Sequence, residues 1–208
     1  MILLFAVLLG LFTGVLRARL LKRAYQPVEL RYVWIVFLAF IPQMFSFYLP
    51  SMRVLIPNSL ASFGLIFSQA LLLGFALMNR DKPGFFALGI GLFLNFFAII
   101  LNGGWMPLRP ETAQQLIPPG VDVNLVLGQR IGFGKDILLT AEMTRLWFLG
   151  DVFTLPSWMN YRLAFSFGDI LISFGAFRFF WSLGNSQHPI HSAKAIKPHP
   201  EEKGCFQP

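Results

Sequence analysis

Residues 60–78 read LASFGLIFSQALLLGFALM, nineteen consecutive residues without a charged side chain. A hydrocarbon core of about 30 Å is crossed by about 17 to 25 helical residues, because each residue of a helix rises by about 1.5 Å. Four further stretches have a similar length and hydropathy: residues 1–16, 33–50, 85–102 and 161–182. The sequence therefore predicts an all-α integral membrane protein with five transmembrane helices.

The composition agrees with this class of protein. Hydrophobic residues make up 55% of the 208 residues and charged residues 13%, whereas soluble proteins contain about 25% charged residues. The mean hydropathy is +0.61. The net charge of +7 comes mainly from basic residues that stand beside the apolar stretches. This placement indicates membrane topology and argues against a nucleic-acid partner.

The first apolar stretch begins at Met1 and is followed, not preceded, by basic residues. A cleavable signal peptide has the opposite arrangement, so we expect this span to be retained with the N-terminus outside. The same rule places residues 103–160 outside as one long loop and residues 183–208 inside as a polar cytoplasmic tail. A basic loop then faces the inner leaflet, where its charges either only fix the orientation or also bind anionic lipid. Its members are Arg17, Arg19, Lys22, Arg23 and Arg31.

Small residues recur at steps of three or four in several spans. Gly10 and Gly14 share one face of the first span, and Gly91 lies on a small, polar face of the fourth. Gly168 has a similar setting in the fifth span. Because small side chains let two helix backbones approach closely, we expect these faces to form helix contacts, either within the chain or with a second chain.

Four spans also carry a polar side chain at a similar depth: Gln43, Gln69, Asn95 and Asp169. At about 1.5 Å per residue, each lies about 10 to 13 Å below the outer end of its span. A carboxylate inside a membrane is costly, so Asp169 marks a candidate site. We expect Asp169 to face Asn95, with Gln69 or Gln43 completing the shell.

Arg162 and Ser166 precede Asp169 at spacings that put all three on one face of a continuous helix. This polar layer has two interpretations. It is either a set of hydrogen bonds that joins helices, or a small polar cavity that takes a cation, a proton or a polar head group.

The loop of residues 103–160 contains its own apolar segment. Residues 136–149 are rich in Leu, Ile, Met and Trp but carry Glu142 and Arg145 near the centre. This pattern predicts an interfacial helix, with a re-entrant or short sixth span as the alternatives.

Three short motifs stand in order along the chain. The first is NGGWMP at residues 102–107, the second is LGD at residues 149–151, and the third is SFGDILI at residues 166–172. They resemble a bacterial family of small membrane proteins that is catalogued as domain of unknown function 5317, and the resemblance covers residues 1–182. The family implies a multi-span protein of the bacterial cytoplasmic membrane and supplies no activity. It also implies that the outer end of the fourth span, the turn at Asp151 and the helix with Asp169 belong to one feature. The outer-face residues of the first two motifs are Asn102, Gly103, Gly104, Met106, Pro107 and Asp151.

Histidine and cysteine, which often support catalysis or bind metals, are absent from the predicted spans. The three histidines, His188, His191 and His199, and the single cysteine, Cys205, all lie in the tail. We therefore expect no metal site and no catalytic residues, while a bound lipid or another hydrophobic cofactor stays open.

Three functions remain, and the first is favoured: a non-catalytic subunit or scaffold of a larger membrane protein complex. The second is binding or transport of a small polar molecule, ion or lipid through the layer around Asp169. The third is a membrane enzyme that acts on lipid with Asp169 or Asp151 as the base.

Overall fold

The computed structural model describes residues 2–118, 120–121, 123–131, 134–156, 159 and 161–185. Most of this part of the chain is helical. The long helices are α1 (Ile2–Leu20), α2 (Trp34–Gln43), α4 (Asn58–Met78), α5 (Phe85–Leu101) and α7 (Phe167–Ser182). Short helical elements are η1 (Met44–Tyr48), α3 (Pro50–Leu55), α6 (Pro110–Leu116), η2 (Trp147–Leu149) and η3 (Leu183–Asn185).

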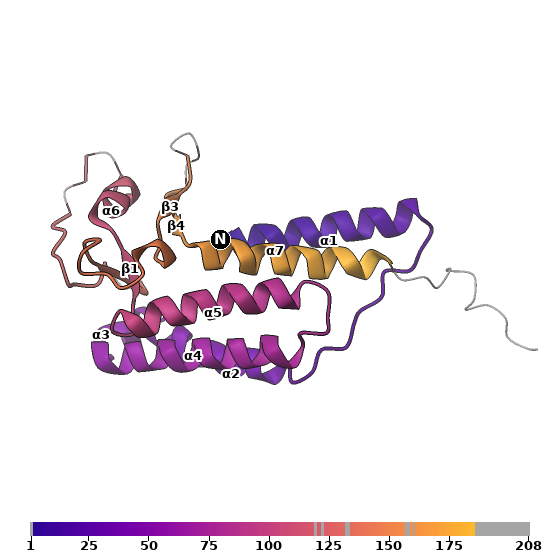
Figure 1. Cartoon of the computed structure of the whole chain (residues 1–208), viewed down its shortest axis with the longest axis horizontal. Coiled ribbons are helices and arrows are strands. Elements are labelled where there is room, and N and C mark those ends of the chain that lie inside the picture. Colours follow the sequence, from indigo (N-terminus) through magenta and orange to yellow (C-terminus); the bar gives the residue numbers. More distant parts are fainter. Residues whose placement is uncertain are drawn as a thin grey trace, which may run out of the picture.

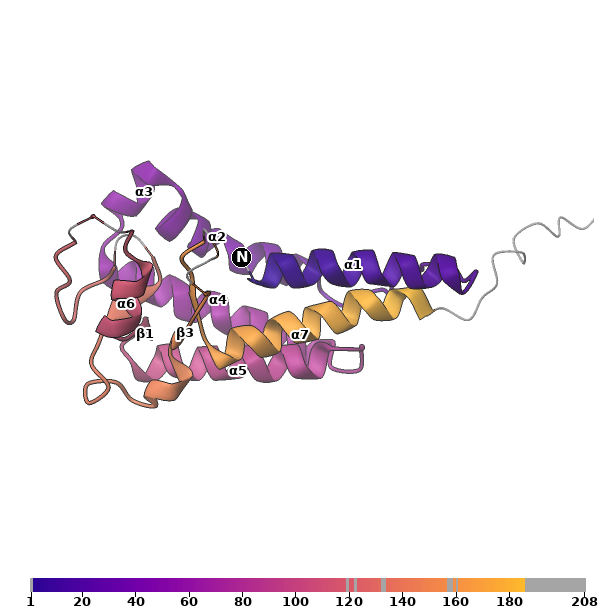
Figure 2. The same cartoon turned by 90° about the horizontal axis from the view of Figure 1, so that it is seen from above.

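The five long helices pack in the spatial order α2, α4, α5, α7, α1, which differs from their order in the sequence. Figures 1 and 2 show them lying roughly along one common direction, with α1 beside α7. The first and last long helices of the described residues are therefore neighbours. Figure 1 also shows that α5 extends past the N-terminus of α7, so α7 begins partway along α5.

Glycines account for the close approach of these helices. A Cβ atom on Gly10 or Gly14 would lie 2.7 Å from a backbone oxygen of α7, and one on Gly91 would lie 2.5 Å from the backbone oxygen of Gly168. Gly168 and Gly175 of α7 face α5 in the same way. The small-residue faces thus form contacts within the chain.

Two helices, α1 and α4, are long and apolar enough to cross a membrane by length and composition. The apolar helices at Trp34–Tyr48 and Phe85–Leu101 are shorter, and α7 has only 16 residues. The helical fold class is confirmed at this level, and the expectation of five spans stays a prediction.

The second apolar stretch, residues 33–50, is not one regular helix. Pro42 lies inside α2, and the hydrogen bonding changes to the π-helical turn η1 directly afterwards. Proline lacks an N–H group, and its ring clashes with the carbonyl group one turn earlier. The chain becomes extended at Leu49, and α3 then begins at Pro50.

The fifth helix starts later than the sequence predicts. Residues 161–166 are not helical, and β4 (Ala164–Phe165) pairs in antiparallel fashion with β3 (Phe153–Thr154). Helix α7 begins at Phe167, because Ser166 is its N-cap. Asp169 therefore lies in the first turn of α7, and the expected position well inside a helix was wrong.

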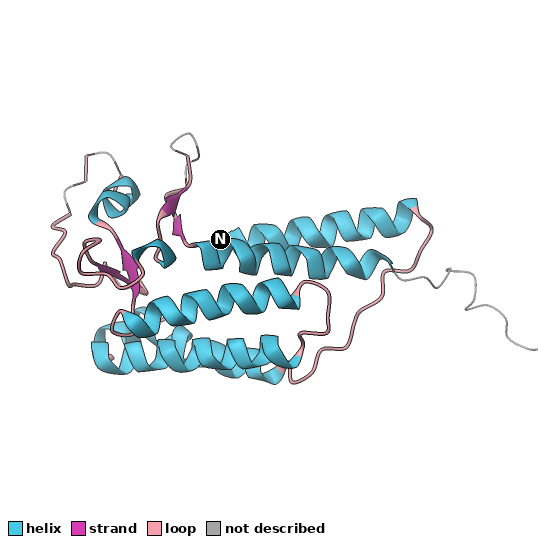
Figure 3. Ribbon diagram, viewed as in Figure 1, coloured by secondary structure: helices cyan, strands magenta, loops and turns pink. Residues whose placement is uncertain are grey.

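The described part of residues 103–160, which we call the outer segment after its predicted side of the membrane, forms a small cap at one end of the helices, where Figure 3 shows all the strands. Strand β1 (Met106–Leu108) pairs in parallel with β2 (Asp136–Leu138), and Leu108 and Leu138 are buried beside Ala113 of α6. The expected helix over residues 136–149 was wrong. Strand pairing uses the first residues of this segment, and Leu146 has φ 54°, which ends any α-helical path before η2.

Candidate functional site

The polar residues of the third motif lie where α7 begins against α5. Ser166 and Asp169 form a capping box: the Asp169 N–H donates to Ser166 Oγ at 3.1 Å, and the Ser166 N–H donates to Asp169 Oδ2 at 3.1 Å. Such a pair satisfies N–H groups that a helix leaves free at its start. The carboxylate also lies near the positive end of the helix dipole.

Asn95 of α5 joins this capping box to the neighbouring helix. Its Nδ2 donates to Asp169 Oδ1 at 2.8 Å, and its Oδ1 accepts a hydrogen bond from Ser166 Oγ at 2.8 Å. Asn95 is 6% exposed, and Ser166 is fully buried. The contact expected between Asn95 and Asp169 is present, and both carboxylate oxygens of Asp169 have donors.

The two glutamines of the predicted polar layer lie elsewhere. Gln43 Nε2 donates to Ser68 Oγ and thus joins α2 to α4. Gln69 Oε1 is buried without a partner in the part of the chain that the structure describes. Neither glutamine hydrogen-bonds to Asp169 among the described residues, so the expected shell around Asp169 was wrong in this respect.

Arg162 also departs from the expected helical face. It precedes β4, and its Nη1 donates to the backbone oxygens of Gln115 and Ile117 at 2.9 and 2.8 Å. Because residues 161–166 are extended, the spacing of Arg162 and Asp169 does not bring them onto one face of α7. Arg162 instead joins the C-terminal end of α6 to the segment that precedes β4 and α7.

A second cluster of charges lies in the outer segment beside the start of α7. Lys135 Nζ lies 2.6 Å from Asp151 Oδ2 and 3.2 Å from Asp136 Oδ1. The pairing of β3 with β4 brings the residues that follow Asp151 next to those that precede Ser166. The structure thus places the Asp151 turn and the Asp169 helix together, as the family resemblance implies.

Burial and the neighbouring charges together set the pKa values of Asp151 and Lys135. Asp151 is 1% exposed, and its burial raises the pKa of the carboxyl group, while the charge of Lys135 offsets this only in part. Burial lowers the pKa of Lys135, but the charges of Asp136, Asp151 and Asp169 outweigh that effect and raise it overall. Asp151 Oδ1 is buried and has no hydrogen-bond partner among the described residues. Lys135 was missed in the sequence, since a single lysine beside a short strand has no distinctive pattern.

The NGGWMP motif connects the end of α5 to the outer segment. Asn102 Nδ2 donates to the backbone oxygens of Ala98 and Arg145, and the Arg145 N–H donates to Asn102 Oδ1 at 2.9 Å. Gly103 and Gly104 have φ of 72° and 87°, a conformation that favours glycine.

The end of this motif is buried. Met106 is 1% exposed, and the Pro107 oxygen accepts a hydrogen bond from the Asp151 N–H at 3.0 Å. The two bonds between Asn102 and Arg145 thus fix the outer segment to the end of α5, and the bond between Asp151 and Pro107 joins two parts of the outer segment to each other.

The basic loop lies at the opposite end of the helices, between α1 and α2. Asn79, fully buried after α4, accepts a hydrogen bond from the Arg31 N–H and donates one to the Arg31 oxygen, at 2.8 and 3.0 Å. The Arg17 guanidinium lies 4.3 Å from the centre of the Trp181 ring. Arg19, Lys22 and Arg23 lie between these two anchors in the sequence. Asn79 was not singled out in the sequence, because a single asparagine at a helix end usually forms only a local cap.

The described residues contain no group of three or more His, Cys, Asp or Glu side chains that could hold a metal ion. The three histidines and Cys205 lie in residues 186–208, outside the described residues, as does nearly all of the predicted tail. The hydrogen bonds around Asp169 join α5 to the N-cap and the first turn of α7.

Comparison with known proteins gives a family without an assigned activity. Residues 27–181 match the family described as "Family of unknown function (DUF5317)". The chain is also 30% identical over 179 residues to an uncharacterised protein of Thermotoga maritima, and this alignment covers 85% of the chain and 86% of the relative. No solved structure matches the chain. The chain belongs to the DUF5317 family, as its three motifs lead one to expect.

Proposed function

We propose that the chain is a non-catalytic integral membrane protein of five spans that serves as a subunit or scaffold of a larger membrane protein complex in the bacterial cytoplasmic membrane. The observation that carries the membrane part is the exposure of large apolar side chains along the helices. Phe5 and Phe12 of α1 are 70% and 66% exposed, Phe37 of α2 is 71% exposed, and Phe63 of α4 is 63% exposed. Lipid tails or a partner helix would cover them.

Charge supports an orientation with the N-terminus outside. Within the part of the chain that the structure describes, the end of the helices that carries the basic loop also carries Arg80, Lys82 and Arg178, against only Glu29 and Asp81. Cytoplasmic loops carry such an excess of Lys and Arg. The outer segment mixes both signs and lies at the other end.

The satisfied hydrogen bonds of Asp169 favour a scaffold over a carrier. Both oxygens of this carboxylate accept hydrogen bonds, from Asn95 and from the Ser166 backbone. A transport site needs polar groups that are free to bind the cargo. The alternative, binding of a small polar molecule, ion or lipid near Asp169, rests on one observation, the buried and unpaired Asp151 Oδ1 in the adjoining cluster.

Cysteine labelling tests the proposed topology. In a Cys205→Ser background, Gln114→Cys should react with a membrane-impermeant maleimide added to intact cells, because Gln114 lies in the outer segment. The native Cys205 should react only after the cells are opened. Rapid labelling of Cys205 in intact cells, with Gln114→Cys protected, would invert the topology.

The subunit role predicts a defined complex larger than the 23.6 kDa chain. Helix α1 packs mainly against α7, and only Gly10, Gly14 and Ala18 are buried along it, so we expect its outer face to contact a partner. Phe5→Ala combined with Phe12→Ala should dissociate the complex extracted in mild detergent, as measured by native electrophoresis.

The matched control is Phe37→Ala combined with Phe63→Ala, which removes two equally exposed rings from α2 and α4. This variant should leave the complex intact. A parent protein that is monomeric in mild detergent, or equal dissociation of both variants, would contradict the proposal.

A further inference from the structure

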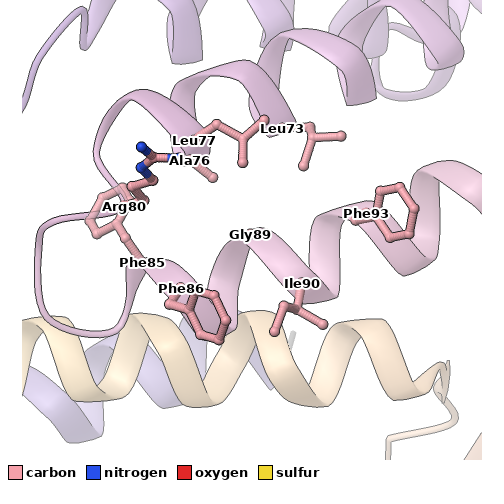
Figure 4. A pocket seen from close by; sticks show the side chains of 9 residues that line it. All are labelled: Leu73, Ala76, Leu77, Arg80, Phe85, Phe86, Gly89, Ile90 and Phe93. Atoms are coloured by element: carbon pink, nitrogen blue, oxygen red, sulfur yellow. The ribbon is translucent and has the colours of Figure 1, made fainter.

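Helices α4 and α5 form an apolar groove of about 300 Å³ toward the end that carries the basic loop. Leu73, Ala76 and Leu77 line it from α4, and Phe86, Ile90 and Phe93 line it from α5. Figure 4 shows Arg80 at one end of the groove and Phe93 at the other. The groove is therefore apolar along its length and cationic at one end.

Glycine keeps this groove open. Gly89 lies on the α5 side, and a Cβ atom added there would meet only the Cβ atom of Ala76, at 3.8 Å. The rings of Phe86 and Phe93 are 72% and 49% exposed, so they form walls rather than a closed core. A flexible apolar chain could enter the groove from the side.

Arg80 has no acidic partner within the described part of the chain, where Asp81 pairs with Lys82 at 3.4 Å. Arg80 comes after Asn79, two residues beyond the end of α4. Asn79 forms two hydrogen bonds with the backbone of Arg31, so Arg31 lies near Arg80. Arg31 and Arg80 are both exposed. At this end, the positive charges of Arg31, Arg80 and Lys82 therefore outnumber the negative charge of Asp81.

We propose that this groove binds an acyl chain of an anionic phospholipid of the inner leaflet, with the lipid phosphate at Arg80. The proposal rests on the membrane placement proposed above. The apolar walls offer the acyl chain contacts but no hydrogen bonds, and a guanidinium group binds phosphate through paired N–H groups. Near the membrane surface, basic side chains also favour anionic over zwitterionic head groups.

Three variants separate the head-group contact from the acyl-chain contact. Arg80→Gln removes the cation, and Arg80→Lys keeps the charge while losing the paired donors. Gly89→Leu fills the groove from the α5 side. Gly74→Leu is the matched control, because it adds the same side chain to a helix of the same pair at a position with nothing within 4 Å of the added Cβ. Arg19→Gln is the control for loss of one charge at the same end of the helices.

Native mass spectrometry of protein purified from membranes measures the outcome, with phosphatidylglycerol and phosphatidylethanolamine of identical acyl chains added in equal amounts. The parent should retain one phosphatidylglycerol. Arg80→Gln should lower this occupancy about tenfold, as the loss of a charged hydrogen bond implies. Arg80→Lys should restore it only in part, because the ammonium group keeps the charge but lacks the paired N–H donors. Gly89→Leu should retain neither phosphatidylglycerol nor phosphatidylethanolamine. Gly74→Leu and Arg19→Gln should retain as much phosphatidylglycerol as the parent.

Unchanged lipid occupancy in Gly89→Leu would overturn the proposal, as would equal loss in Gly74→Leu. Inorganic phosphate should not displace the lipid, and displacement would assign the site to the free anion. If the parent protein sediments with membranes but retains no phosphatidylglycerol, the lipid site is contradicted and the proposed membrane function is not. If the parent protein is recovered in the soluble fraction, the proposed membrane function is contradicted.

Discussion

Asp169→Ala should destabilise the folded protein by about 2 to 5 kcal/mol, because it leaves two buried donors without acceptors. These donors are the side-chain amide of Asn95 and the backbone N–H of Ser166. The start of α7 would lose its capping box at the same time. Unfolding in mixed micelles by increasing sodium dodecyl sulfate, followed by tryptophan fluorescence, measures the difference.

Asp169→Asn is the informative partner of this variant. Its oxygen can still accept from the Ser166 N–H, and a rotated Asn95 amide can turn its own oxygen toward the new NH₂ group. That rotation takes the Asn95 oxygen away from the Ser166 hydroxyl, which loses its present acceptor. We therefore expect a loss of about 1 to 2 kcal/mol, smaller than that of Asp169→Ala. If Asp169 served a bound cation or proton, this variant would stay folded but lose a pH- or cation-dependent change in stability that the parent shows. An equal, large loss of stability in Asn and Ala variants would contradict the hydrogen-bonding role.

Gly168→Ala should separate α5 from α7 and lower the stability by about 1 to 3 kcal/mol or more, the usual cost of overpacking a close contact. The added Cβ would lie 2.7 Å from the backbone oxygen of Gly91, and it would overlap the Asn95 side chain. Backbone atoms cannot move aside as a flexible side chain can. The same unfolding measurement applies, with loss of the Asn95 contact as a second consequence.

Gly74→Ala is the matched control, since no atom lies within 4 Å of its added Cβ. It should be neutral or slightly stabilising, because alanine favours a helix more than glycine does. A Gly168→Ala variant as stable as Gly74→Ala would show that α5 and α7 are not packed as closely as the structure has them.

Helix positions and the central contact could be predicted from the sequence because they depend on local hydropathy and on regular geometry. Helices α4 and α5 begin and end within two residues of the predicted boundaries. The contact between Asn95 and Asp169 followed from counting depth along the spans. That count assumed that residues 161–166 are helical. In the structure they are not: Ala164 and Phe165 form β4, and Ser166 is the N-cap of α7, where it contacts Asn95.

The late start of α7 had a signal in the sequence. Ser166 and Asp169 are spaced as N-cap and third residue of a capping box. The continuous apolar character of residues 161–182 concealed this signal, because hydropathy alone does not tell a strand from a helix.

The outer segment could not be predicted in the same way. Strand β1 pairs with β2 across about thirty intervening residues, Met106 opposite Asp136, and periodicity in a short window carries no information about such a pairing. The ion pair of Lys135 with Asp151 depends on this arrangement. Only the family resemblance indicated that the Asp151 turn and the Asp169 helix lie together.

The adjacency of α1 and α7 has a consequence for synthesis. A chain leaves the ribosome from its N-terminus, so α1 is made first while the helix that covers its glycine face is made last. Until α7 emerges, Gly10 and Gly14 lack the contact with the backbone of α7 that they have in the folded chain. The start of α7 depends in turn on Asn95 and on the β3–β4 pairing. The contact between α1 and α7 therefore forms only after α7 has been translated, although α1 is made long before it.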